Sequence, residues 1–128
     1  MTVDWAFAGI GAVGEELASL VQGTLCFSKV NIAEARKFGK VVFEGYLAGL
    51  DDAGWRGDPR LVRIGYTVGS ILTFGLGYGL FQLDKSLYPW YEQAFGRPID
   101  EIMGLFAEQN RYLLELADET RNMLAAIN

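Results

Sequence analysis

The sequence contains no histidine and only one cysteine, Cys26, among its 128 residues. Without histidine there can be no Ser-His-Asp or Cys-His catalytic arrangement and no imidazole metal ligand. One cysteine and no histidine also exclude a zinc site of the usual kind. A bound metal would therefore be magnesium, manganese or calcium, held by carboxylate and carbonyl oxygens. A general base would have to be Asp, Glu, Lys or Tyr.

Basic residues are also fewer than acidic ones, 11 against 16, which gives a net charge of −5. This charge argues against a general nucleic-acid binder, because such a protein needs a basic surface to neutralise phosphates. A single cysteine cannot form an internal disulfide, so a reducing compartment is expected. The opening residues "MTVDWAF" show no basic region before an apolar run. We therefore expect no signal peptide and a cytoplasmic protein.

What the sequence does contain is a series of apolar residues at helical spacing. Asn31 opens an N-x-x-E helix start, Asp58 followed by Pro59 opens another, and Gly54 is a typical helix C-cap. No strand of more than a few residues is predicted. The pattern predicts an all-α fold, with residues 1–128 forming a single domain that is a bundle of about five helices. They are expected from Gly14, from Asn31 to Gly54, from Asp58 through to Leu83, near Tyr88 to Phe95, and from Ile99 onward.

The run from Ile64 to Leu83 carries no charge and has the length of a membrane span. Its Gly, Thr, Ser, Tyr and Gln residues dilute its hydrophobicity, and the neighbouring amphipathic helices need an apolar partner. We therefore expect a packed helix and no membrane contact. Three closely spaced glycines, Gly75, Gly77 and Gly79, are expected to break or bend it. Its apolar side is predicted to be Leu61, Ile64, Val68 and Leu72.

Two other clusters have competing interpretations. The aromatic stretch Tyr88 to Phe95 fits packing in the core or at an interface, and also an organic-ligand pocket. The last helix carries charges of both signs on one side, which is typical of an exposed, salt-bridged surface. These charged residues are Arg111, Glu115, Asp118, Glu119 and Arg121.

Two stretches resemble a known family. "VDWAFAGIGAVGEELASL", at residues 3–20, places Asp4 before Trp5, continues through a glycine-containing loop and ends near the Glu-Leu-Ala triplet that begins at Glu16. "FEGYLAGLDDAGWRGDPRLVRIGY" spans residues 43–66. The first resembles the metal-binding stretch of aminoglycoside phosphotransferase-like small-molecule kinases, and the second resembles their helical substrate-side region. The resemblance implies that Asp4 is a ligand of the magnesium ion that bridges the nucleotide phosphates.

The same resemblance predicts that kinase activity is absent. In the family, the Gly-rich nucleotide lobe, its phosphate-binding lysine and the His-Gly-Asp catalytic loop all precede the aspartate that Asp4 resembles. Without any histidine, the catalytic loop cannot stand elsewhere in this sequence. We therefore expect a stand-alone, truncated C-terminal helical part of such a kinase. It should neither bind ATP tightly nor phosphorylate aminoglycosides.

Two other functions stay open. In the first, Asp4, Glu15 and Glu16 are the catalytic residues of a small hydrolase. Asp4 would hold Mg²⁺ or Mn²⁺, and the metal would activate water against a small phosphorylated substrate, a phosphate ester. Glu15 and Glu16 also fit a purely structural role, because a helix start favours acidic residues. In the second, the chain is a helical interaction module whose apolar face pairs with another chain.

A homodimer is expected on the kinase-like interpretation. Helices that pack against the rest of a larger kinase would otherwise expose apolar surface, and a two-fold dimer is the commonest way to cover it. The alternative is an N-terminal loop that folds back over its own core, which its glycines permit. The surface is expected near Trp5, Phe7, Ile10 and Val13, and beside the run from Ile64 to Leu83.

Overall fold

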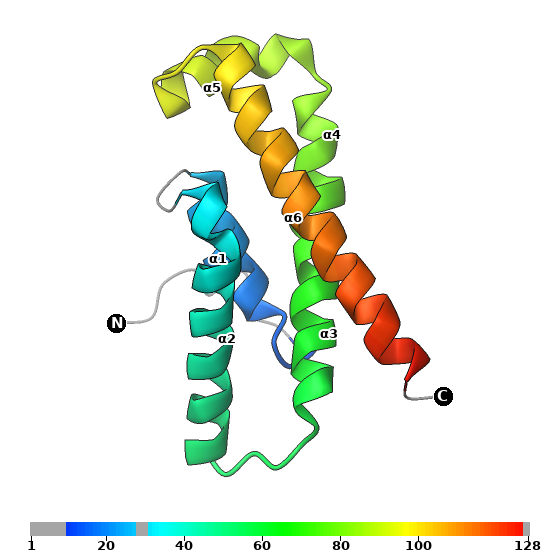
Figure 1. The fold of residues 1–128 in the computed structure, drawn as a ribbon. Coiled ribbons are helices and arrows are strands. Elements are labelled where there is room, and N and C mark those ends of the chain that lie inside the picture. Colours follow the sequence, from blue (N-terminus) through cyan, green and yellow to red (C-terminus); the bar gives the residue numbers. More distant parts are fainter. Residues whose placement is uncertain (1–9, 28–30, 127–128) are drawn as a thin grey trace.

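The computed structural model describes residues 10–27 and 31–126. Within these ranges the protein is all-α and contains no strand, which confirms the predicted fold class (Figure 1). Two short 3₁₀ turns, Ile32–Glu34 and Lys85–Leu87, precede the second and fifth helices. The α-helices are α1 (Glu16–Cys26), α2 (Ala35–Asp52), α3 (Pro59–Ser70), α4 (Tyr78–Gln82), α5 (Tyr88–Phe95) and α6 (Ile99–Ala125).

The helix starts and ends follow the local signals in the sequence. Before α2, the Asn31 side chain accepts a hydrogen bond from the backbone N–H of Ala33 at 2.9 Å. Before α3, Asp58 accepts one from the N–H of Arg60, also at 2.9 Å. Gly54 follows α2 with a φ of 85°, a backbone conformation that favours glycine. These three predicted caps are confirmed.

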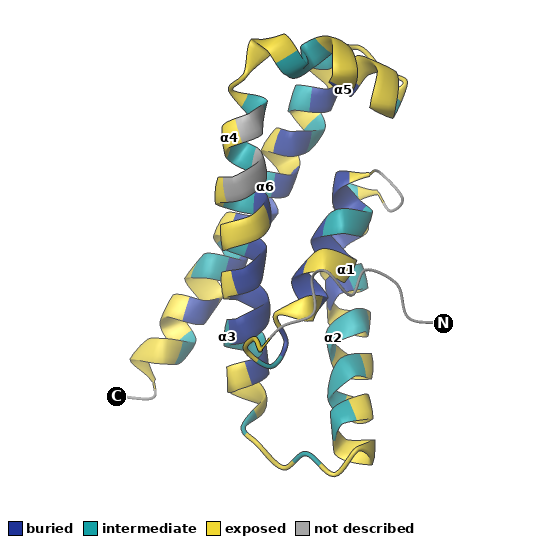
Figure 2. Ribbon diagram, turned by 180° about the vertical axis from the view of Figure 1, so that it is seen from behind, coloured by how far each residue is buried: buried dark blue, intermediate teal, exposed yellow. Residues whose placement is uncertain are grey.

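The core lies where α1, α3 and α6 meet. Figure 2 shows their buried residues on the sides that face one another. The long helix α6 crosses α3. The sequence predicts a stripe of apolar residues along α6, and its centre is confirmed, because Ile102, Phe106, Leu113 and Leu116 are buried. Helix α2 lies at the edge of this core, half-buried on its inner side and exposed on its outer side. The least exposed large apolar side chains are Val21, Val62, Tyr66 and Ile102.

The apolar side predicted for α3 and the residues after it is mostly exposed. Ile64 is half-buried, but Leu61, Val68 and Leu72 are 53%, 44% and 57% exposed. The packed side instead contains Gly65, where an added Cβ would lie 2.3 Å from the carbonyl oxygen of Val13. The missing side chain lets the segment before α1 touch the backbone of α3. Close backbone packing, rather than leucine content, therefore decides which side of α3 is buried.

The three closely spaced glycines do not break the helix after α3. The chain continues as a π-helical segment, Ile71–Gly77, and then as α4, so that one helical run extends from Pro59 to Gln82. A π-helical turn accommodates an extra residue without ending the helix. The buried Phe74 of this segment lies beside Gly23 of α1. No helix in the described ranges is long and apolar enough to cross a membrane.

The aromatic residues of α5 pack against α6. The Tyr91 ring meets the Phe106 ring edge to face, with centroids 5.8 Å apart, and Phe95 meets the same ring at 5.8 Å. Such edge-to-face pairs add to the stability gained from burial. These contacts support the packing interpretation of the aromatic stretch.

Candidate functional site

Of the three residues predicted to form a catalytic site, the structure describes two, Glu15 and Glu16. Asp4, the predicted metal ligand, lies outside the described residues, as do Trp5 and Phe7. Glu15 and Glu16 are exposed at the start of α1. They point to different partners, because a Glu15 carboxylate oxygen accepts from the backbone N–H of Ala12 at 3.1 Å.

Glu16 belongs to a small cluster that joins α1 to α2. Its carboxylate accepts a hydrogen bond from the Tyr46 hydroxyl, and the Tyr46 oxygen accepts one from the backbone N–H of Gly14 at 3.3 Å. Burial first, and then the hydrogen bond to Glu16, raise the pKa of Tyr46 above its ordinary value. Both glutamates therefore have structural partners at the helix start.

The residues 10–27 and 31–126 contain no group of three or more acidic or cysteine side chains that could hold a metal ion. Glu15 and Glu16 thus do not form a metal site with other described carboxylates. A hydrolytic centre at Asp4 stays a prediction. The hollow beside Glu15 and Glu16, of about 650 Å³, is bordered by residues 10–13, 15–16 and 18–19, by Tyr46 and by Thr73.

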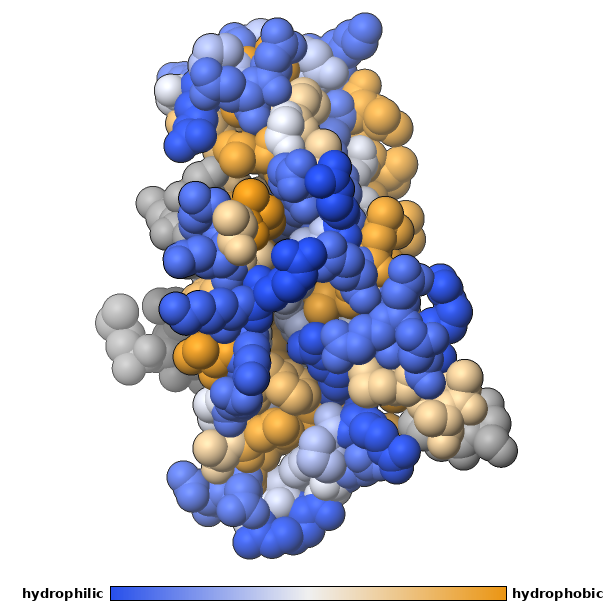
Figure 3. Space-filling model, viewed as in Figure 1, coloured by the Kyte–Doolittle hydropathy of each residue, from blue (hydrophilic) through white to orange (hydrophobic). Residues whose placement is uncertain are grey.

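A second hollow lies between α2, α3 and α6 and has a volume of about 640 Å³. We call it the interhelical groove. Figure 3 shows apolar surface along it, flanked by charged side chains of α2 and α6. Its apolar lining consists of Phe43, Leu47, Pro59, Tyr112, Leu116 and Met123, and its charged lining of Arg36, Lys40, Glu44, Arg60, Arg63, Glu115 and Glu119.

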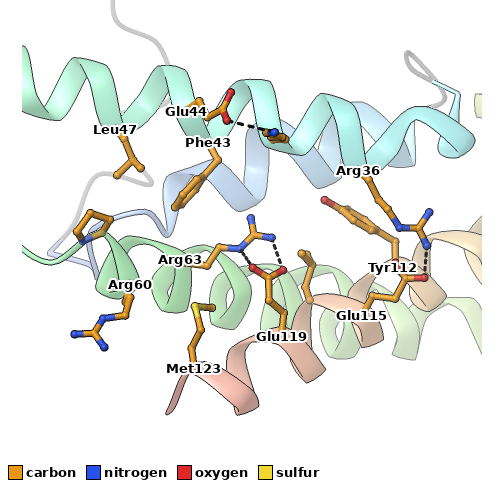
Figure 4. A pocket seen from close by; sticks show the side chains of 13 residues that line it. Arg36, Phe43, Glu44, Leu47, Arg60, Arg63, Tyr112, Glu115, Glu119 and Met123 are labelled. Atoms are coloured by element: carbon orange, nitrogen blue, oxygen red, sulfur yellow. Dashed lines mark hydrogen bonds and ion pairs between the residues drawn. The ribbon is translucent and has the colours of Figure 1, made fainter. Parts of the chain in front are cut away.

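Arg63 of α3 is the most enclosed cation of the groove, with a side chain only 17% exposed. Its guanidinium carbon lies 5.2 Å from the centre of the Phe43 ring and 5.3 Å from that of Tyr66. Its Nε and Nη2 atoms donate to the two carboxylate oxygens of Glu119, at 3.0 and 2.7 Å (Figure 4). A paired fork of this kind fixes the orientation of the guanidinium plane.

The other charges of the groove also pair across helices or along them. Arg36 of α2 forms an ion pair with Glu115 of α6. Lys40 lies 3.8 Å from Glu44, one turn further along α2. Arg60 pairs with Asp58, its own helix cap, at 2.6 Å. The ion pairs of Arg36 and Arg63 therefore connect α6 to α2 and to α3.

Sequence reasoning missed this groove, because it treated the charges of α6 as one solvated surface. Asp118 does pair along the helix with Arg121, as predicted. Glu115 and Glu119 instead pair with Arg36 and Arg63, which are distant in sequence. The available signal was the four-residue spacing of Glu115 and Glu119, which places two acids on one side of α6.

Fold and groove together define an all-α protein with an open, charge-lined groove between three helices. Comparison of the chain with models of known families, with curated proteins and with solved structures finds no match. The resemblance to aminoglycoside phosphotransferase-like kinases therefore stays a prediction from two stretches of sequence.

Proposed function

We propose that this chain is the C-terminal helical part of an aminoglycoside phosphotransferase-like protein and binds a small organic molecule in the interhelical groove. One observation carries the proposal. The stretch at residues 43–66, which resembles the substrate-side region of that family, supplies a wall of the groove through Phe43, Leu47, Pro59, Arg60 and Arg63. Sequence resemblance and groove geometry thus point to the same part of the molecule.

The size and chemistry of the groove support this role. Small-molecule sites are usually hollows of about 300–1,000 Å³, lined mainly by apolar side chains with a few placed polar groups. The groove has about 640 Å³, and Phe43, Leu47, Leu116 and Met123 give it an apolar floor. Two of its ion pairs, Arg36–Glu115 and Arg63–Glu119, link α6 to α2 and to α3 across the groove.

We propose no kinase activity for this chain by itself. Phosphoryl transfer depends on cations and backbone groups that position a nucleotide, and on a residue that orients the acceptor. In the family these come from the Gly-rich lobe and from a histidine-containing loop, and this sequence has no histidine. The free, buried Cys26 fits a reducing compartment, so we propose the cytoplasm as its location.

Filling the groove should abolish ligand binding. We expect a ligand-observed NMR screen of small organic molecules to give binders that are lost in Leu47→Trp, because the larger ring occupies the space between α2 and α3. Val41→Trp is the matched control, since Val41 is also on α2, is 61% exposed and does not line the groove. Circular dichroism shows whether both variants are folded. Binders that persist in folded Leu47→Trp, or an absence of binders, would contradict the proposal.

An interaction module is the second candidate, and it also has a specific observation in its favour. Val68, Leu72, Leu76 and Leu80 of one helical run, and Leu83 directly after it, are 44–77% exposed, near the apolar edge at α4 in Figure 3. We call these residues the leucine face. They repeat at intervals of three or four residues, as one side of a helix does. Monomeric proteins in water seldom expose an apolar patch of more than roughly a few hundred Å².

We propose that the leucine face pairs with that of a second copy, because uncharged faces can meet without repulsion although the chain carries −5. Light scattering over a dilution series should give about twice 14.2 kDa at high concentration. Leu76→Glu should convert the dimer to a monomer, since it would bury two charges. Val41→Glu, on α2, should leave it a dimer. A mass of 14.2 kDa at every concentration would end this proposal.

A further inference from the structure

We propose that the interhelical groove selects an organic anion, an apolar body carrying one carboxylate or phosphate group, held by Arg63 and Lys40. This inference rests on the proposed small-molecule role of the groove and adds the charge of the ligand. Two observations support it. The arginine and lysine side chains of the groove keep unused hydrogen-bond donors, and the floor of the groove is apolar.

Two of the three carboxylates of the groove, Glu115 and Glu119, are already engaged. Both oxygens of Glu119 accept from Arg63, and Glu115 is paired with Arg36. A cationic ligand would have to displace an arginine from one of them, which exchanges one ion pair for another. It would also leave the half-buried guanidinium of Arg63 without its partner, and an unpaired charge away from water is costly. Only Glu44, whose partner Lys40 is 3.8 Å away, is loosely held.

The cations, in contrast, keep unused donors. A guanidinium has five N–H groups, and Glu119 takes one from Nε and one from Nη2 of Arg63. In Figure 4 the remaining nitrogen of Arg63 points away from Glu119, toward α2. Among the described residues, neither this nitrogen nor the Lys40 ammonium has a hydrogen-bond acceptor, since the Lys40–Glu44 distance exceeds hydrogen-bonding range.

The position of these donors fits a ligand with an apolar body. Lys40 precedes Phe43 by three residues and Leu47 by seven, so all three share one side of α2. Arg63 lies against the Phe43 ring from the α3 side. An anion at the Arg63 and Lys40 end would therefore leave its body over Phe43 and Leu47. The guanidinium is planar and preorganised by the Glu119 fork, which suits carboxylate and phosphate alike.

Four naphthalene compounds that carry an anionic, a neutral or a cationic substituent on the same ring position test the inference. Calorimetric titrations would use 1-naphthyl phosphate, 1-naphthoate, neutral 1-naphthol and cationic 1-naphthylmethylamine. Both anions should bind about tenfold more tightly than 1-naphthol, and the amine most weakly, because only an anion gains charge-assisted hydrogen bonds. The preference should shrink in 0.5 M salt, which screens exposed charges such as Lys40. If only 1-naphthyl phosphate or only 1-naphthoate binds, the result identifies whether the groove recognises a phosphate or a carboxylate group.

Lysine variants locate the interaction. Lys40→Met should weaken binding of the anions about three- to fivefold and leave 1-naphthol unchanged, as expected for one exposed charge. Lys37→Met is the matched control, because Lys37 is exposed on the same helix, carries the same charge and does not line the groove. Arg63→Lys keeps the charge but loses the fork, and should weaken anion binding further. Its urea unfolding curve shows whether it is folded.

The possible failures are distinguishable. If 1-naphthol binds as tightly as 1-naphthoate and Leu47→Trp abolishes both, the anion preference is wrong and the groove remains a small-molecule site. Tighter binding of the amine, or equal losses in Lys40→Met and Lys37→Met, would also overturn the preference. If none of the four compounds binds and the NMR screen gives no groove ligand, both proposals fail.

Discussion

Replacement of Gly14 by alanine should lower the free energy of unfolding by about 3–5 kcal/mol, a sum of backbone strain and overpacking. Gly14 has a φ of +90°, where residues with a side chain are strained. An added Cβ would also lie 2.3 Å from the carbonyl oxygen of Val62, a backbone atom of α3 that cannot move without shifting the helix. This glycine belongs to the first stretch that resembles the kinases, and the structure gives it a packing role.

Gly65 of α3 lies on the opposite side of the contact between α3 and the segment before α1. Its missing side chain accommodates the carbonyl oxygen of Val13. Gly65→Ala should therefore destabilise the protein by about 1–3 kcal/mol from overpacking, although alanine is the better helix former.

Gly45→Ala is the matched control, because Gly45 lies inside α2 and nothing would stand within 4 Å of the new Cβ. It should stabilise the protein by about 1 kcal/mol, the ordinary difference between the two residues in a helix. Urea unfolding followed by far-UV circular dichroism measures all three variants. If Gly14→Ala and Gly65→Ala match Gly45→Ala in stability, the close packing of α1 on α3 is incorrect.

The second large effect is expected at alkaline pH and depends on Tyr66. This side chain is 1% exposed, and its oxygen accepts a hydrogen bond from the Gln22 amide at 3.2 Å. Burial first, and then its neighbour Tyr112, raise the pKa of Tyr66 far above the ordinary value of 10.0. The phenol must therefore stay protonated for the core to remain packed.

The sign of the pH dependence follows from this shift. Below pH 10 both the folded and the unfolded chain hold the Tyr66 proton, so the stability it contributes is fully present. Above pH 10 the unfolded chain loses this proton and the folded protein keeps it, which favours unfolding. The free energy of unfolding should fall by up to about 1.4 kcal/mol per pH unit through Tyr66, and by roughly 2–3 kcal/mol at pH 12.

Tyr66→Phe tests the assignment. It should lower stability at pH 7 by about 1–2 kcal/mol, because the buried Gln22 amide loses an acceptor. It should also make the fall above pH 10 shallower. Tyr46→Phe is the comparison variant, since Tyr46 is half-buried and its pKa is also raised, and it should change the slope less. Urea unfolding between pH 7 and 11.5 measures the slopes. Equal slopes in Tyr66→Phe and the unchanged protein would contradict this account.

Parts of the site depend on relations that no local pattern contains. Arg36 and Glu115, or Arg63 and Glu119, are far apart in sequence, and their pairing depends on how α6 crosses α2 and α3. The sequence pattern assigned Glu115 and Glu119 to a solvated surface, because each side chain alone fits an exposed helix face. The predicted apolar side of α3 was mostly wrong for a related reason, since Leu61, Val68 and Leu72 are exposed. The spacing of apolar residues shows that one side of a helix is apolar, but it does not show whether another helix packs against that side.

The sequence by itself determined the all-α class, the caps at Asn31, Gly54 and Asp58 and the buried stripe of α6, because each depends on residues within a few positions. It also excluded histidine and zinc chemistry by composition. Only the tertiary structure decided that α3 packs through Gly65, that its helix continues through a π segment, and that charges of three helices border one groove. These features depend on close contacts between segments that are distant in sequence. Such contacts form only when the helices pack together in the bundle.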